Sequence, residues 1–172
     1  MRNQLDHLVF CATTLKEGID HIGEALGVKV PSAGIHTQMG THNAVMQLGN
    51  NIYFEIIAIN PESDAPQRPR WFSMDNASDR LAIHSKPRLI TWVANTEDLK
   101  QLTNLSTYPY PEGLSMTRET KNGLLEWSIT VAEDGTLPAA GLLPTLIQWK
   151  QPSLHPSNKM IDLGCRLASL TG

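Results

Sequence analysis

The chain has 172 residues, of which 41% are hydrophobic and 18% are charged, and its formal net charge is −3. This length is enough for one domain with its own core, and so small a net charge argues against a nucleic-acid-binding surface or a basic membrane-binding patch. The apolar runs are too short to cross a bilayer, and the first residues do not resemble a secretory signal. We therefore expect a cytoplasmic protein, without a nucleic-acid or membrane partner, in which Cys11 and Cys165 are reduced thiols.

The first sixty residues predict a β-α-β-β-β unit. A β-prone run at residues 5–12 comes first, and the capping-box pattern Thr14-Leu15-Lys16-Glu17 then begins a helix that Gly27 ends. Three further strands are expected at residues 28–31, 42–48 and 52–60. A polar turn region at residues 32–41 separates the first two of these strands.

Residues 61–84 interrupt this pattern and predict a linker or a lid, because they hold three prolines and show no clear periodicity. Two interpretations are open. In the first, Trp71 and Phe72 attach a connector to the body of the protein, and Arg68 and Arg70 are solvated. In the second, the segment is a lid that places Arg68 or Arg70 over an anionic substrate.

The second half repeats the first in outline. A strand is expected at 88–94, and Thr96 then caps a helix that contains Leu99, Leu102 and Leu105. Further strands are expected at 115–120, 124–131 and 145–149, with a hairpin turn at Lys121-Asn122-Gly123.

This internal repeat predicts an α+β fold in which two βαβββ modules form a curled mixed β-sheet with a central cleft. We expect a single domain over residues 1–172. Its parts are module 1 at about 1–60, the linker or lid at about 61–84, module 2 at about 85–151 and a C-terminal tail at 152–172.

Two ionisable residues lie inside apolar strands and are the first candidates for chemistry. His7 lies within residues 5–10, and Glu55 lies within residues 52–57. A buried carboxylate costs free energy unless it has a partner, so His7 and Glu55 are expected to share a divalent metal or to act as an acid–base pair. The alternative is that Glu55 is solvated on a wet face of its strand. Superposing the two halves by eye places His7 on Thr91 and Glu55 on Gln148.

Several motifs, in this order and spacing, resemble the glyoxalase-like domain family of the vicinal oxygen chelate superfamily. They are Leu5-Asp6-His7-Leu8-Val9, Tyr53-Phe54-Glu55, Pro69-Arg70-Trp71-Phe72, Pro87-Arg88-Leu89-Ile90-Thr91-Trp92, Pro144-Thr145-Leu146-Ile147-Gln148-Trp149 and His155-Pro156. The likeness covers about residues 3–167. The superfamily includes glyoxalase I, extradiol dioxygenases, epimerases and bleomycin-resistance-type binding proteins, so the resemblance implies a glyoxalase/dioxygenase-like fold and leaves the reaction open.

The resemblance also implies a set of site residues. Metal-dependent members hold one divalent ion, such as Zn, Ni, Fe or Mn, at the four positions taken here by His7, Glu55, Thr91 and Gln148. His7, Glu55 and Gln148 are then the expected metal ligands, whereas Thr91 departs from the pattern because a neutral hydroxyl is a weak ligand. Residues expected to contact the substrate are Arg70, Trp71, Thr91, Trp92 and Trp149.

Three functions remain open at this point. One is a metal-assisted lyase, isomerase or dioxygenase, in which the ion polarises adjacent substrate oxygens and Glu55 and His7 are catalytic. Another is a metal-free protein that sequesters an aromatic compound in a cleft lined by Trp71, Trp92, Trp127 or Trp149. In the last, Glu55 and His7 perform acid–base chemistry without a metal.

The C-terminal tail predicts one further feature. Residues 164–170 alternate like a strand, and a free edge strand must pair with another strand. We therefore expect a homodimer that binds a small-molecule ligand.

Overall fold

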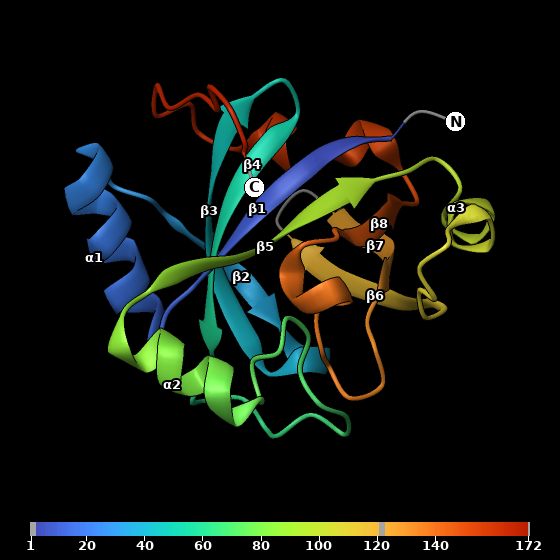
Figure 1. Cartoon of the computed structure of the whole chain (residues 1–172). Coiled ribbons are helices and arrows are strands. Elements are labelled where there is room, and N and C mark those ends of the chain that lie inside the picture. The colour runs from blue at the N-terminus through green and yellow to red at the C-terminus, as the bar shows by residue number, and fades with distance from the viewer. Residues whose placement is uncertain (1–2, 121–122, 172) are drawn as a thin grey trace.

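The computed structural model describes residues 3–120 and 123–171 and contains one eight-stranded sheet. Module 1 supplies β1 (Gln4–Cys11), α1 (Leu15–Leu26), β2 (Ser32–His36), β3 (Thr41–Gly49) and β4 (Ile52–Ile59). Helix α2 (Ala77–Ser85) follows. Module 2 supplies β5 (Arg88–Asn95), α3 (Leu99–Leu105), β6 (Gly113–Thr120), β7 (Gly123–Thr130) and β8 (Thr145–Trp149). The sheet curls around its own inner face, with α1 and α2 on one side and α3 on the other (Figure 1).

The strand order shows that the two modules are copies of one arrangement. The order is β2-β3-β4-β1-β5-β8-β7-β6, in which each module's first strand pairs in parallel with its last strand. Strands β1 and β5 are antiparallel neighbours at the centre, with Leu8 opposite Trp92. This confirms the predicted α+β fold of two βαβββ modules in a curled mixed sheet.

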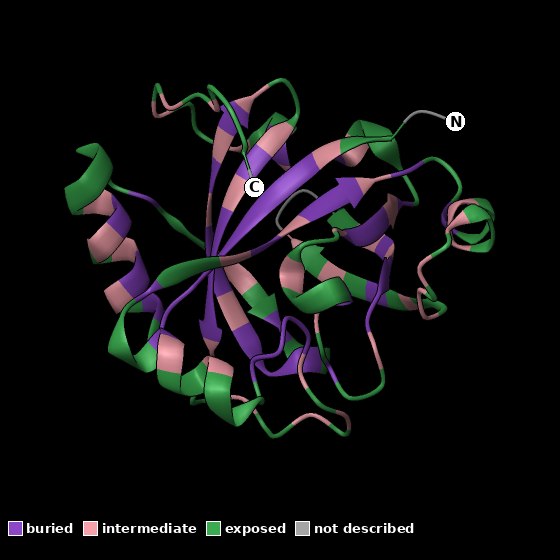
Figure 2. Ribbon diagram, viewed as in Figure 1, coloured by how far each residue is buried: buried purple, intermediate pink, exposed green. Residues whose placement is uncertain are grey.

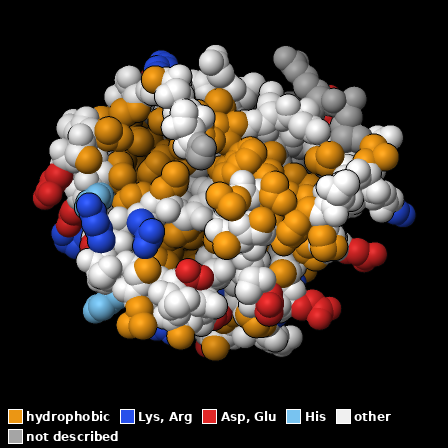
Figure 3. All heavy atoms as spheres, viewed as in Figure 1, with side chains coloured by type: hydrophobic (Ala, Val, Ile, Leu, Met, Phe, Trp, Pro, Cys, Tyr) orange, Lys and Arg blue, Asp and Glu red, His pale blue; other side chains and the backbone are white. Residues whose placement is uncertain are grey.

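Apolar side chains pack on both faces of the sheet. Helix α1 lies against β3 and β4, where Leu15 and Ile22 join a cluster with Leu8, Phe10 and Ile56. A second cluster fills the inside of the curl and contains Val9, Val93, Trp127, Ile147 and Trp149, among others. Figure 2 shows the buried residues concentrated in the strands, while the helices keep an exposed outer side. The face in that view also carries broad areas of hydrophobic side chains (Figure 3).

Two predictions for module 1 and the linker differ from the structure. The strand expected at 28–31 instead begins at Ser32, because Pro31 has no N–H to give to a ladder. The linker contains helix α2, whose first turn is capped by the Asn76 side chain accepting from the N–H groups of Ser78 and Asp79.

Two predictions in the second half also need correction. Helix α3 is capped by Asp98 and not by Thr96. The Thr96 hydroxyl instead accepts a hydrogen bond from the Asp98 N–H, just before the helix begins. Residues 164–170 are not a strand: Gly164 has a φ of +78°, and the segment donates one backbone hydrogen bond, from Leu167 N to Leu48 O. The hairpin turn expected at 121–123 lies partly outside the described residues.

Within the described part of the chain, no helix has both the length and the apolar sequence needed to cross a membrane.

Candidate functional site

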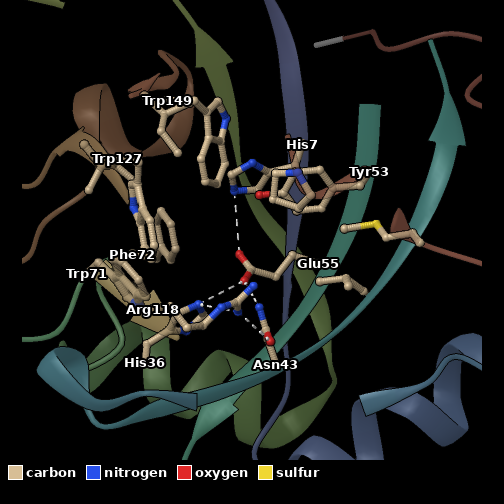
Figure 4. Close-up of a pocket in the computed structure, with 15 residues that line it drawn as sticks. His7, His36, Asn43, Tyr53, Glu55, Trp71, Phe72, Arg118, Trp127 and Trp149 are labelled. Carbon is tan, nitrogen blue, oxygen red and sulfur yellow. Dashed lines mark hydrogen bonds and ion pairs between the residues drawn. The ribbon is translucent and has the colours of Figure 1, made fainter. Parts of the chain in front are cut away.

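A small cavity lies inside the curl of the sheet, with a volume of about 30 Å³. This is room for roughly one or two water molecules. The walls come from both modules, from the segment after β4 and from the segment after β8. Its lining residues are His7, His36, Asn43, Val45, Tyr53, Glu55, Trp71, Phe72, Arg118, Trp127, Ile129, Ile147, Trp149, Pro156 and Met160. In Figure 4, His7 and Glu55 point toward each other across this space.

His7 is oriented by the residue before it. Its Nδ1 lies 2.6 Å from Asp6 Oδ1, and both side chains are buried. The pairing of β1 with β5 shifts register between Leu5 and His7, so Asp6 lies at a bulge. A bulge re-aims a side chain, which accounts for two consecutive residues pointing inward. With Nδ1 donating to Asp6, the Nε2 atom of His7 faces the cavity.

Asp6 is the centre of a buried network that fixes several cavity residues. Its Oδ2 accepts hydrogen bonds from Asn95 Nδ2 at 2.9 Å, from Trp149 Nε1 at 2.9 Å and from His155 Nε2 at 3.0 Å. Burial raises the pKa of the Asp6 carboxyl, but the hydrogen bonds from His155 and His7 outweigh burial and hold this pKa well below its usual range. Asp6 is therefore a carboxylate that positions His7, Trp149 and His155.

Glu55 is held from the opposite side. Its Oε1 accepts a hydrogen bond of 2.6 Å from Asn43 Nδ2, and its Oε2 lies 3.6 Å from His7 Nε2. The side chain is buried, so the solvated alternative for Glu55 is wrong. The orientation of the Asn43 amide is set by its Oδ1, which accepts from the backbone N–H of Gly34 at 3.1 Å. One oxygen of Glu55 is thus anchored, and the other faces the imidazole.

His36 and Arg118 form the next part of the wall. Arg118 Nη1 lies 3.3 Å from His36 Nε2, and His36 Nδ1 lies 3.2 Å from Thr41 Oγ1. Because a guanidinium can only donate, Nε2 of His36 is the acceptor and Nδ1 carries the hydrogen. Burial, together with the Arg118 charge, lowers the pKa of His36 to about 3, so this imidazole is neutral.

Aromatic side chains make up most of the remaining surface. Tyr53 stacks on His7 with ring centroids 4.4 Å apart, and Trp127 lies 5.5 Å from Trp149. Trp71 meets His36 edge-on at 4.9 Å and stacks on Phe72. Burial, together with the Asp6 and Glu55 charges, raises the pKa of Tyr53 well above its usual value, so its phenol stays neutral. The walls around the His7–Glu55 pair are therefore mostly aromatic.

Comparison with protein-family models matches residues 5–172 to the glyoxalase-like domain. The chain belongs to the glyoxalase-like domain family. A search of curated proteins gives no significant match to this glyoxalase-like chain.

Solved structures show the same glyoxalase-like fold at low sequence identity. A hypothetical protein from Staphylococcus aureus is 16% identical with a TM-score of 0.65; the match covers 92% of this chain but only 63% of that one. Methylmalonyl-CoA epimerase from Mycobacterium tuberculosis is 15% identical with a TM-score of 0.52, over 87% of this chain and 89% of the other. A Streptomyces coelicolor methylmalonyl-CoA epimerase variant in complex with 2-nitronate-propionyl-CoA is 14% identical with a TM-score of 0.52, over 86% and 98% of the two chains. At such identities the likeness shows the fold alone.

The glyoxalase-like cavity brings together only some of the residues expected from the sequence. His7, Glu55, Trp71 and Trp149 line it. The others lie elsewhere: Arg70 pairs with Asp75, Thr91 bonds the carbonyl of Trp92, Trp92 donates to the carbonyl of Leu142, and Gln148 binds the backbone of Glu97 and Leu99.

Strand register explains why Gln148 lies away from the cavity. The pairs His7–Val93 and Val9–Thr91 relate His7 to Thr91, as the superposition by eye has it. Glu55 pairs with Val9, and Thr145 pairs with Val93, so the counterpart of Glu55 is Thr145. Gln148 is three residues further along β8, and an odd offset turns a strand side chain to the other face.

The expected metal set does not fit this site. The module 2 counterparts of His7 and Glu55 are Thr91 and Thr145, which are weak metal ligands. The remaining imidazole nearby, that of His36, accepts a hydrogen bond from the Arg118 cation. In residues 3–120 and 123–171, no group of three or more His, Cys, Asp or Glu side chains is placed to hold a metal ion. Only His7 and Glu55 remain as strong donors, and we route no chemical step through a metal.

Proposed function

We propose that this chain binds a small organic molecule with its reactive carbon at the cavity, and that it moves a proton at this carbon, next to a carbonyl group, with Glu55 and His7 as an acid–base pair. The observation that carries this proposal is the geometry of the pair. Nε2 of His7 and Oε2 of Glu55 lie 3.6 Å apart in the cavity, and the other polar atom of each is fixed, by Asp6 and by Asn43. Two proton-transfer groups held in this way suit general acid–base catalysis.

The step balances with these two residues. The Glu55 carboxylate takes a proton from carbon, the C–H electron pair moves onto the carbonyl oxygen to give an enolate, and a proton then returns to carbon. Return at the same carbon gives epimerisation or exchange, and return at a neighbouring atom gives isomerisation. When His7 takes up a proton, the Asp6 carboxylate at its Nδ1 stabilises the imidazolium. Removal of Glu55 from water by the buried walls strengthens these electrostatic interactions.

The test follows proton exchange directly. Wild type, E55Q and H7A proteins are incubated in D₂O with EDTA and a panel of carbonyl compounds that carry an α-hydrogen, and loss of the α-hydrogen signal is followed by ¹H NMR. We expect exchange with wild type, and a loss of about 10²-fold or more in each variant. Wild-type exchange that matches buffer alone for every compound would refute the proposal.

Binding without catalysis is the second candidate, because five aromatic side chains line the cavity beside the polar pair. In that case E55Q and wild type bind the same aromatic compounds, as measured by quenching of tryptophan fluorescence, and neither shows exchange.

The homodimer expected from the sequence stays a prediction. Residues 164–170 do not form the edge strand from which it was argued. Sedimentation velocity at micromolar concentration tests it, and a monomer would contradict it.

A further inference from the structure

A second, larger pocket adjoins the cavity and has a volume of about 510 Å³. It is bordered by β6, β7 and the segment after β8. Four residues line both spaces: Val45, Arg118, Pro156 and Met160. The outer pocket has the size of a small-molecule site, whereas the inner cavity holds little more than water. The two spaces therefore meet at these four residues.

Arg118 lies at the junction, and in the described part of the chain its guanidinium forms no ion pair. Among the described residues, no carboxylate oxygen lies within 4.0 Å of its guanidinium. Its Nη1 contacts the neutral His36 ring at 3.3 Å and the amide oxygen of Asn43 at 3.5 Å. Its Nε is buried and has no hydrogen-bond partner within that part of the chain. A half-buried cation with a free N–H matches an anion with two oxygens, since a guanidinium binds a carboxylate in a planar fork.

The indole N–H of Trp71, another residue that lines the inner cavity, is a second donor left unpaired by the described residues and suggests that the ligand carries a hydrogen-bond acceptor. Trp71 is only 3% exposed, and in the described structure its Nε1–H has no hydrogen-bond partner. Buried indole N–H groups are normally paired, so this one indicates an acceptor that the chain itself does not supply.

The fold also makes room for Arg118. Strands β2 and β6 are the two edge strands of the curled sheet, and the Arg118 side chain projects from β6 toward β2. A Cβ atom on Gly34 of β2 would lie 3.1 Å from Arg118 Nη1 and 3.3 Å from its Cδ, so the glycine lets the arginine pass close to the backbone. Lys159 and Glu119 also line the outer pocket, and both are exposed.

Met160 lines both the outer pocket and the inner cavity and has a flexible side chain. Its backbone is fixed by hydrogen bonds to Gln47 and Ser157. Its unbranched side chain has several rotatable bonds, so it can move aside without movement of the chain.

We propose that the outer pocket and the inner cavity form one site for a small organic carboxylate, with the carboxylate bound by Arg118 where the two spaces meet. The reactive carbon then lies on the inner side, near Glu55. This inference deepens the proposed function by naming its substrate class, but the binding step can be tested by itself.

The experiment compares acids with their uncharged amides. Phenylacetate, benzoate and 3-phenylpropionate, each beside the corresponding amide, are titrated into wild type, R118M, R118K and R88M, and binding is followed by calorimetry and tryptophan fluorescence. Arg88 is an exposed arginine of β5, so R88M controls for loss of one positive charge. We expect wild type and R88M to prefer the acid by at least about tenfold, R118M to lose this preference, and R118K to keep part of it.

The acid-to-amide comparison in wild type needs no variant, so the proposal stays testable even if R118M does not fold. A panel in which no acid binds more tightly than its amide, including one in which nothing binds, would overturn it. So would R118M with the same preference as R88M. Carboxylates that bind through Arg118, together with no proton exchange on any compound of the carbonyl panel, would refute the proposed reaction and leave this inference standing. Exchange on uncharged ketones that is the same in R118M and wild type would support the proposed reaction and refute this inference.

Discussion

Replacement of Asp6 by Asn tests the network that holds the acid–base pair. Three donors, from Asn95, Trp149 and His155, converge on Oδ2, and His7 binds Oδ1. D6N keeps the shape but removes the charge. Hydrogen bonds to a charged group contribute ~1 kcal/mol more than neutral ones, so the three bonds to Oδ2 together predict a loss of about 3 kcal/mol in the free energy of unfolding.

The same substitution should change the chemistry of His7. If the amide oxygen replaces Oδ2, the amide NH₂ faces His7 Nδ1 and donates to it. The imidazole hydrogen then moves to Nε2, where the cavity needs a proton acceptor. We therefore expect proton exchange to fall by about 10²-fold or more, a larger effect than the stability loss explains while the protein is still folded.

Urea unfolding followed by tryptophan fluorescence at pH 7 measures the stability term, with D20N as the control because Asp20 is an exposed residue of α1. D20N should cost less than about 0.5 kcal/mol. The low pKa of Asp6 in the folded state means that its stabilisation is present above the unfolded-state pKa of about 3.9 and is lost as pH falls below that value. The gap between wild type and D6N should therefore shrink in acid. A D6N protein as stable as D20N, with exchange intact, would refute this account of the network.

Three further predictions test other features. G135A should lower the free energy of unfolding by at least ~1 kcal/mol in calorimetry, because Gly135 has a φ of +75° and a Cβ there would lie 2.1 Å from the Arg70 carbonyl oxygen; an unchanged melting temperature would contradict it. Ellman's reagent at pH 8 should modify Cys165 and spare Cys11 in the folded protein, since burial raises the pKa of the Cys11 thiol to about 12; two equally fast thiols would be inconsistent with that environment. EDTA should leave the melting temperature within about 1 °C, because only two strong donors face the cavity, whereas a large drop together with stoichiometric metal by elemental analysis would restore the metal interpretation.

The fold could be predicted from the sequence because short local sequence patterns specify each element of its repeat. The Thr14 capping box, the Gly27 stop and the alternation in the long strands each act over a few residues, and they appear in the structure where expected. The errors fall where local signals compete. Pro31 moved a strand edge, and Asn76 began a helix inside a segment that otherwise reads as a loop.

The candidate site was harder to predict, because it depends on register and on exceptions to alternation. His7 and Glu55 were found as charges in apolar runs, and they do meet. Asp6 was missed because a bulge turns it inward next to His7, against the period of two. Arg118 was missed because its role depends on the meeting of β2 and β6, which are far apart in sequence. The available signal was an arginine two residues after Met116, and therefore on the same face of β6 as this apolar side chain.

The two modules share one topology but contribute unlike parts to the cavity. Module 1 provides the proposed proton-transfer pair, together with Asp6 and Asn43, whereas module 2 provides Trp127, Ile129, Ile147, Trp149 and the junction arginine, Arg118. In the proposed function, one half of the pseudo-symmetric sheet therefore reacts with the ligand and the other half recognises it. Substitutions of Trp127, Ile129 and Ile147 can reshape this wall, while His7, Glu55 and the residues that hydrogen-bond to them come from the other half of the sheet. Trp149 is an exception, because it also donates a hydrogen bond to Asp6. Engineering of ligand preference in this chain would begin with the other three residues.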